Sequence, residues 1–128
     1  MKKKLFKIKW SADDYFDLGN EYRFGNHFSK AIEAYCRAVE LNPNMAEAYN
    51  CMGLAYNEKN MPHEAISCFE KACAIDPQYA AAYFNAGLTY VLLGNYPKAQ
   101  KAFERTLSIN PQDENAVRML RMVKSQER

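Results

Sequence analysis

Few side chains of this chain have types and spacing that could perform chemistry. The candidates are four cysteines and two histidines: Cys36, Cys51, Cys68, Cys73, His27 and His63. No two cysteines form a Cys-x-x-Cys pair, and a metal site built on two histidines would lack its remaining ligands. No serine lies in a nucleophile motif, and no glycine-rich phosphate loop occurs. The sequence therefore predicts no enzyme, no metal site and no cofactor.

The cysteines are better explained as small apolar helix residues of a protein in a reducing compartment, which predicts a cytoplasmic location. A disulfide framework or a metal site is the less favoured alternative. No stretch has the length of a membrane span, and no apolar run of a secretory signal follows the first lysines.

Charge is distributed unevenly along the 128 residues. Residues 1–10 contain five lysines and no acid, which leaves 12 basic and 15 acidic residues, a net charge of −3, in the rest. The body is therefore not a general binder of polyanions, and only the N-terminal arm could contact RNA or an anionic membrane. In that arm Phe6, Ile8 and Trp10 alternate with lysines, a pattern of extended chain.

The elements that position the other side chains repeat with a fixed period. One set of residues is Tyr49, Met52, Gly53, Tyr56, Ala65, Phe69, Ala72 and Pro77. It recurs one period earlier as Tyr15, Leu18, Gly19, Tyr22, Ala31, Tyr35, Ala38 and Pro43. It recurs one period later as Tyr83, Ala86, Gly87, Tyr90, Ala99, Phe103, Thr106 and Pro111. Spacings of three and four place each half-set on one face of a helix.

This pattern, with its period of about 34 residues, resembles the tetratricopeptide repeat, a helix–turn–helix unit. The resemblance implies an all-α fold, a right-handed α-α superhelix of three repeats plus a capping helix. The expected parts are a basic arm (1–11), repeats at 12–45, 46–79 and 80–112, and a capping helix (113–128). The chain begins with Met and ends with this helix, so we expect a complete small protein, with a fragment of a longer array as the alternative.

Local signals predict the helix ends. Ser11 and Asp14 form a capping box before a first helix at 12–25, and Asp113 can cap a last helix at 114–126. Second helices of the repeats are expected at 28–41, 62–75 and 96–109, with an Asn-Pro or Asp-Pro pair after each. Left-handed backbone is expected at Asn26, Asn60 and Gly94, and a close helix crossing at Gly53.

In stacks of this family the first helix of each repeat lines a concave surface where partners bind. The resemblance thus implies a peptide-binding groove of Phe16, Asn20, Phe24, Asn50, Leu54, Ala81, Phe84, Asn85 and Leu88. The asparagines would bond a peptide backbone through their amides. Alternatively, Leu88 and Val91 simply pack against the final helix.

Members of the family that serve heat-shock chaperones hold a C-terminal carboxylate with Lys, Asn, Asn, Lys and Arg. Of these positions this chain keeps only Asn20. The basic ones fall on Phe16, Ala81 and Asn85, and the middle Asn falls on Cys51. Without those cations a carboxylate would lose its charge-assisted bonds, so the sequence predicts no such clamp.

The sequence thus predicts a non-catalytic, cytoplasmic adaptor that binds a protein or peptide in the concave groove. One alternative is a scaffold that self-associates through its groove, ends or arm, for example as a homodimer. A third interpretation is contact of the basic arm with RNA or an anionic membrane, although the net charge of −3 in the rest of the chain disfavours nucleic acid as a partner. The arm itself, with Phe6, Ile8 and Trp10, is expected to pack on the groove or an adjoining end.

Overall fold

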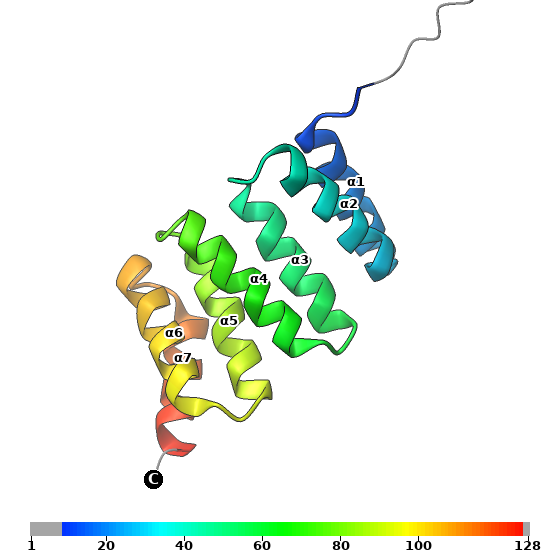
Figure 1. Cartoon of the computed structure of the whole chain (residues 1–128). Coiled ribbons are helices and arrows are strands. Elements are labelled where there is room, and N and C mark those ends of the chain that lie inside the picture. The colour runs from blue at the N-terminus through cyan, green and yellow to red at the C-terminus, as the bar shows by residue number, and fades with distance from the viewer. Residues whose placement is uncertain (1–8, 127–128) are drawn as a thin grey trace, which may run out of the picture.

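The computed structural model of this chain describes residues 9–126, which form seven α-helices joined by short turns (Figure 1). The helices are α1 (Ala12–Phe24), α2 (Phe28–Leu41), α3 (Ala46–Glu58), α4 (Pro62–Ile75), α5 (Ala80–Leu92), α6 (Tyr96–Ile109) and α7 (Glu114–Gln126). No strand occurs among the described residues, as an all-α fold requires. None of these helices is long and apolar enough to cross a membrane.

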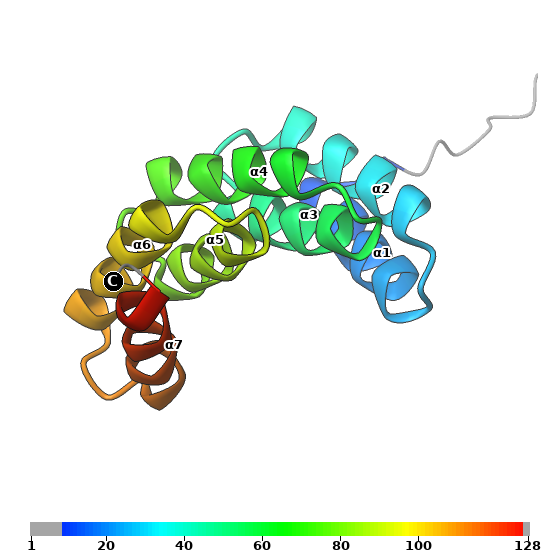
Figure 2. The same ribbon diagram turned by 90° about the horizontal axis from the view of Figure 1, so that it is seen from below.

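The helices stack in sequence order into a curved superhelix (Figure 2). Each of α1, α3 and α5 packs against the helix that follows it, and each pair packs against the next pair. Figure 2 shows α2, α4 and α6 along the outer side of the curve and α1, α3 and α5 along the inner side. The inner helices therefore present the concave side of the molecule.

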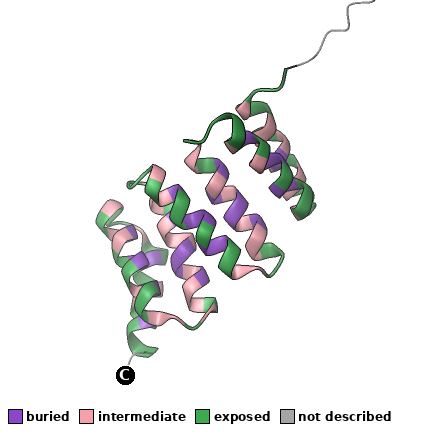
Figure 3. Ribbon diagram, viewed as in Figure 1, coloured by how far each residue is buried: buried purple, intermediate pink, exposed green. Residues whose placement is uncertain are grey.

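Each pair of helices crosses where a glycine meets a buried ring. A Cβ atom added to Gly53 would lie only 2.5 Å from Cε1 of Phe69, so a larger side chain cannot fit without displacing the ring. The same contact joins Gly19 to Tyr35 and Gly87 to Phe103. All three rings are fully buried, and buried residues gather on the facing sides of the helices (Figure 3). The close crossing expected at Gly53 is confirmed.

The predicted helix ends are confirmed with one difference. Ser11 and Asp14 form the capping box, and Asn26, Asn60 and Gly94 adopt positive φ angles of 63°, 58° and 73°. Helix α1 ends at Phe24 rather than at residue 25. The reason is that the N–H of Asn26 bonds to the carbonyl of Arg23, which closes a tighter turn before the chain reverses.

Helix α7 covers the last repeat. Asp113 caps it by accepting a bond from the N–H of Ala116 at 3.1 Å, and Ala116 and Val123 are fully buried. Val123 shares a cluster with Ala99 and Phe103 of α6. Arg121 of α7 stands one repeat period after Gly87, at the position where a further helix would cross α7. A bulky charged side chain here takes the place of the glycine that such a close crossing needs.

The described part of the arm is short. Phe6 and Ile8 lie outside the described residues. Trp10 is 42% exposed and its ring lies against that of Tyr15, with 5.1 Å between the centroids.

Candidate functional site

The concave face consists of the side chains that α1, α3 and α5 turn toward the inner side of the curve. Six equivalent positions of each inner helix, spaced by one, three or four residues, fall on one side of that helix. In α1 they are Asp13, Phe16, Asp17, Asn20, Arg23 and Phe24. In α3 they are Glu47, Asn50, Cys51, Leu54, Asn57 and Glu58. In α5 they are Ala81, Phe84, Asn85, Leu88, Val91 and Leu92.

A polar network joins the first two repeats on this face. The hydroxyl of Tyr35 donates to Oδ1 of Asn20 at 2.6 Å and accepts from Nε of Arg23 at 3.1 Å. Nη2 of Arg23 points at Sγ of Cys51, 3.9 Å away. Burial raises the pKa of Tyr35 to about 12, against the opposing effect of Arg23, so the hydroxyl keeps its proton at neutral pH. The carbonyl of Asn20 is therefore used within the fold, and its amide nitrogen is the group it could offer to a peptide.

A second network joins the last two repeats. Nδ2 of Asn85 donates to Oδ1 of Asn50 at 3.0 Å, and Nδ2 of Asn57 donates to the hydroxyl of Thr89 at 2.9 Å. Asn50 is only 7% exposed. Oδ1 of Asn57 is buried and finds no hydrogen-bond donor among residues 9–126. Asn50 thus links the helices, while Asn85 lies half-buried at the surface of the face.

The predicted apolar groove residues fall into two groups. Phe16 packs on Tyr35 and Phe84 on Phe103, with ring centroids 5.9 and 5.6 Å apart. Leu54, Leu88 and Val91 are also half-buried, and each packs against a core cluster. The cluster of Leu88 and Val91 includes Val123 of α7, as the packing alternative predicts.

In contrast, Phe24 and Leu92 project from the face. Each is 74% exposed, and they occupy the same repeat position at the C-terminal ends of α1 and α5. Glu58 holds this position in α3 and is exposed, as is Ala81 at the other end of α5. The guanidinium of Arg23 lies over the ring of Phe24, 4.8 Å from its centroid. Phe24 and Leu92 therefore offer apolar area that the fold does not use.

Charge divides the face. The four carboxylates that α1 and α3 place on this face, those of Asp13, Asp17, Glu47 and Glu58, are all exposed. Helix α5 contributes no charged residue to the face. Arg23 is the one cation among the eighteen positions and is bonded to Tyr35. The result is an acidic half beside an apolar half.

Three features of the site escaped sequence reasoning. Tyr79, the residue before α5, is half-buried, and burial raises its pKa, with further contributions from Cys51 and Glu47. A hollow of about 980 Å³ lies beside Tyr79 and is also lined by Glu47, Lys71 and neighbouring residues. Helix α7 adds exposed Arg118 and Met122, which stand one repeat period after Phe84 and Leu88. The repeat register could have found these two, whereas Tyr79 is not matched in type by the preceding repeats.

The four cysteines are unreactive thiols, of which Cys68 is buried and the other three are half-buried. Burial raises the pKa of Cys68 to about 12 and that of Cys73 to about 11, and it also raises the pKa of Cys36 and of Cys51. A thiol that stays protonated is a poor nucleophile and a poor metal ligand. Residues 9–126 hold no group of three or more His, Cys, Asp or Glu side chains that could bind a metal ion.

The family follows from sequence comparison. A tetratricopeptide repeat profile matches residues 44–112, and a second profile, described as TPR repeat, matches residues 19–60. The chain therefore belongs to the tetratricopeptide repeat family. The search of curated proteins found no significant match to this sequence.

Solved structures agree with the fold. The first TPR of Spaghetti (RPAP3) bound to the HSP90 peptide SRMEEVD matches with a TM-score of 0.87 and 24% identity over 91% of this chain and 92% of that one. MamA matches with a TM-score of 0.87 and 30% identity over 91% of this chain and 68% of that one. The second TPR domain of human RPAP3, in complex with the HSP70 peptide SGPTIEEVD, matches with a TM-score of 0.84 and 26% identity over 88% of this chain and 94% of that one. Two of these three structures are TPR domains with a bound peptide, so this chain shares its fold with peptide-binding domains.

Proposed function

We propose that this chain is a non-catalytic adaptor whose concave face binds a short basic and apolar segment of a partner protein. The observation that carries this proposal is the exposure of Phe24 and Leu92 at one repeat position, with the carboxylate of Glu58 between them. Aromatic side chains are enriched in protein interfaces, and an exposed apolar side chain that the fold does not need is available as an anchor for a partner.

The spacing of these anchors sets the length of the ligand. Neighbouring packed helices lie about 8–10 Å apart, so α1 and α5 are separated by roughly 20 Å across α3. An extended chain covers about 3.3 Å per residue, so about six residues span the two anchors. A ligand with apolar residues near its ends and a basic residue between them would match Phe24, Glu58 and Leu92.

Charge selects the kind of ligand. Exposed Asp13, Asp17, Glu47 and Glu58 favour lysine or arginine side chains, whose approach they would also accelerate. The same carboxylates disfavour an acidic peptide. This chain has Phe16, Ala81 and Asn85 where the family's carboxylate clamp has cations, so we propose that it does not bind acidic chaperone tails such as those in the RPAP3 complexes.

The absence of catalysis and the cytoplasmic location belong to this proposal. The raised pKa values of all four thiols support the first, because a protonated thiol is not an activated nucleophile. The placement of the same cysteines as ordinary packing residues inside helices supports the second.

Binding of three labelled peptides of equal length to the intact chain tests the chemistry of the ligand. One peptide combines leucine and lysine, the second has glutamate in place of lysine, and the third is SRMEEVD. The proposal predicts that the lysine peptide binds at least about tenfold more tightly than either acidic one, and that added salt weakens it. Tighter binding of an acidic peptide, or binding of none, would overturn the proposal.

A further inference from the structure

We call the interface between two neighbouring repeats a joint. The N-terminal end of the stack exposes one side of such a joint, with no second side among residues 9–126. Between the second and third repeats, a hollow of about 320 Å³ has one wall from α4, with Glu70 and Cys73, and another from α5 and α6. Tyr83, Tyr90 and Lys98 line that second wall.

The residues two repeat lengths earlier, Tyr15, Tyr22 and Lys30, line a hollow of about 670 Å³ on α1 and α2. No helix precedes α1 among residues 9–126, so the counterpart of the α4 wall is missing there. The end face therefore has the surface of a joint without its second side.

Trp10 marks the edge of this face. It lines a hollow of about 390 Å³ with Asp14, Asp17, Leu18 and Glu21, and its ring lies on Tyr15. Leu18 also lines the larger hollow, so the two are continuous along α1. The chain thus enters α1 with an aromatic side chain already seated on the open joint.

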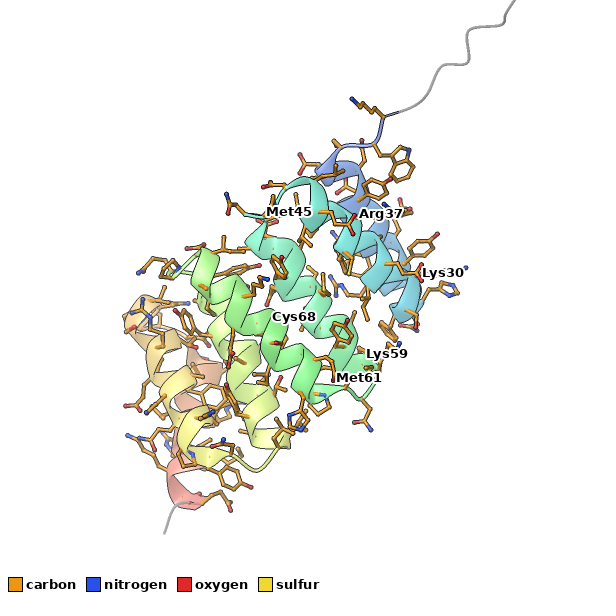
Figure 4. All side chains as sticks on the ribbon, in the orientation of Figure 1. Lys30, Arg37, Met45, Lys59, Met61 and Cys68 are labelled. Atoms are coloured by element: carbon orange, nitrogen blue, oxygen red, sulfur yellow. The ribbon has the colours of Figure 1, made fainter. Side chains whose placement is uncertain are left out.

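The charges near Trp10 are acidic. Asp14, Asp17 and Glu21 are all exposed and lie on α1 beside it. The cations of this end face are on α2, where Figure 4 labels Lys30 and Arg37. The sequence before Trp10 has the opposite charge, with five lysines and no acid.

The cations on α2 already have partners. Lys30 lies over the ring of Tyr22, 5.8 Å from its centroid. Arg37 lies 3.6 Å from Glu40, an exposed pair. Neither of these cations neutralises the carboxylates beside Trp10. Those carboxylates can therefore attract lysine side chains from outside this face.

We propose that residues 1–8 of the same chain cover the open joint and take the place of the missing wall. In an extended chain, Phe6 and Ile8 face the same side as Trp10, while Lys7 and Lys9 face the other. Eight extended residues reach up to about 27 Å, enough to follow α1. The arm then seals the first repeat as α7 seals the last, which leaves the concave face as the binding surface.

The rate of tryptic cleavage after Lys4 in the full-length chain tests this inference. Trypsin requires an exposed, extended segment, so a docked arm is cut only from its released state. The reference is a free peptide of residues 1–12. One test variant, Asp17→Asn/Glu21→Gln, leaves the arm sequence intact, and a second, Phe6→Ser/Ile8→Ser, alters only the arm. Glu58→Gln/Glu104→Gln makes the same charge change at exposed sites elsewhere.

The inference predicts that the wild-type chain is cut at least about tenfold more slowly than the peptide. Both test variants should be cut severalfold faster than the wild type, and the Glu58/Glu104 control should not. The rates should be the same at all protein concentrations. Equal rates for the chain and the peptide would overturn the inference, as would protection that persists in both test variants. Protection that appears only at high concentration would overturn it in favour of an arm exchanged between copies.

Discussion

The glycine–ring crossings and the concave face obey opposite rules within the same repeats. At the crossings, a Cβ atom added to Gly19, Gly53 or Gly87 would lie at nearly the same distance from a carbon of a six-membered aromatic ring in all three repeats. On the concave face, one repeat position holds Phe24, then Glu58, then Leu92. The repeated residues are the buried ones, and the unrepeated residues are among the most exposed.

This difference separates what stabilises the molecule from what it can recognise. A solenoid needs the same contact at each joint, because each repeat buries its apolar face only on its neighbours. Exposed positions are free of that requirement and can carry a particular pattern of charge and apolar area. The first repeat departs partly from this rule, because Tyr35 adds a hydroxyl that Phe69 and Phe103 lack, and that hydroxyl bonds to Asn20 on the concave face.

The largest expected effect is the loss of a crossing ring. Phe69→Ala should lower the free energy of unfolding by about 3–5 kcal/mol, because it removes a fully buried ring from the central joint. Urea unfolding followed by circular dichroism measures it. The matched substitution Phe24→Ala, at an aromatic that is 74% exposed, should change stability by less than about 0.5 kcal/mol. Similar losses in the two variants would remove the distinction between the two regions.

Enlarging the glycine attacks the same contact from the other side. Gly53→Leu should destabilise by roughly 1–3 kcal/mol, because the new side chain must enter space held by Phe69. Gly94→Ala is a control at a glycine with nothing near its Cβ, where only the positive φ of 73° opposes the change. An unchanged urea midpoint for Gly53→Leu would show that the crossing is not close in solution.

A smaller effect is expected where the two regions meet. Tyr35→Phe keeps the ring at the crossing but removes the hydroxyl that donates to Asn20 and accepts from Arg23. We expect a loss of about 0.5–1.5 kcal/mol, the net contribution of such a hydrogen bond. Full stability in this variant would mean that the network does not tie the face to the core.

High pH should weaken the same link gradually. Because the folded pKa of Tyr35 is raised to about 12 from 10.0, its contribution is complete below pH 10 and is lost as the pH rises toward 12. Tyr90, whose pKa burial also raises to about 12, acts in the same direction. Thermal unfolding across this range should show a decline that is shallower in Tyr35→Phe. A parallel decline in both proteins would assign the effect to other groups.

The fold could be predicted because its signals are repeated and local. The repeat period predicted the helices and their crossings, and Asn26 and Asn60 marked turns that need a left-handed residue. The concave face was predicted in outline only, since helical spacing names the helix side but not the depth of each side chain. Whether Phe84 projects or leans onto Phe103 depends on a rotamer and a neighbouring helix, which the spacing does not contain.

Interactions between repeats were also beyond the sequence. The bonds from Asn85 to Asn50 and from Arg23 toward Cys51 join residues about one repeat apart, and no motif announces them. They show that an asparagine on the concave side can serve the fold rather than a ligand. Exposure, which separates Phe24 and Leu92 from Phe16 and Phe84, comes only from the packed structure.

The most direct test of the account uses the peptide that combines leucine and lysine. Isothermal titration measures its affinity for three forms of the chain. These are the wild type, Phe24→Ala/Leu92→Ala, and Leu41→Ala, which removes a side chain that is 56% exposed on the outer helix α2. The account predicts at least about tenfold weaker binding, or about 1.4 kcal/mol, for the double variant, with the wild-type affinity kept by Leu41→Ala. Urea midpoints should be alike for all three. Equal affinities, or a loss in Leu41→Ala as large as in the double variant, would contradict the assignment of the concave face as the binding surface.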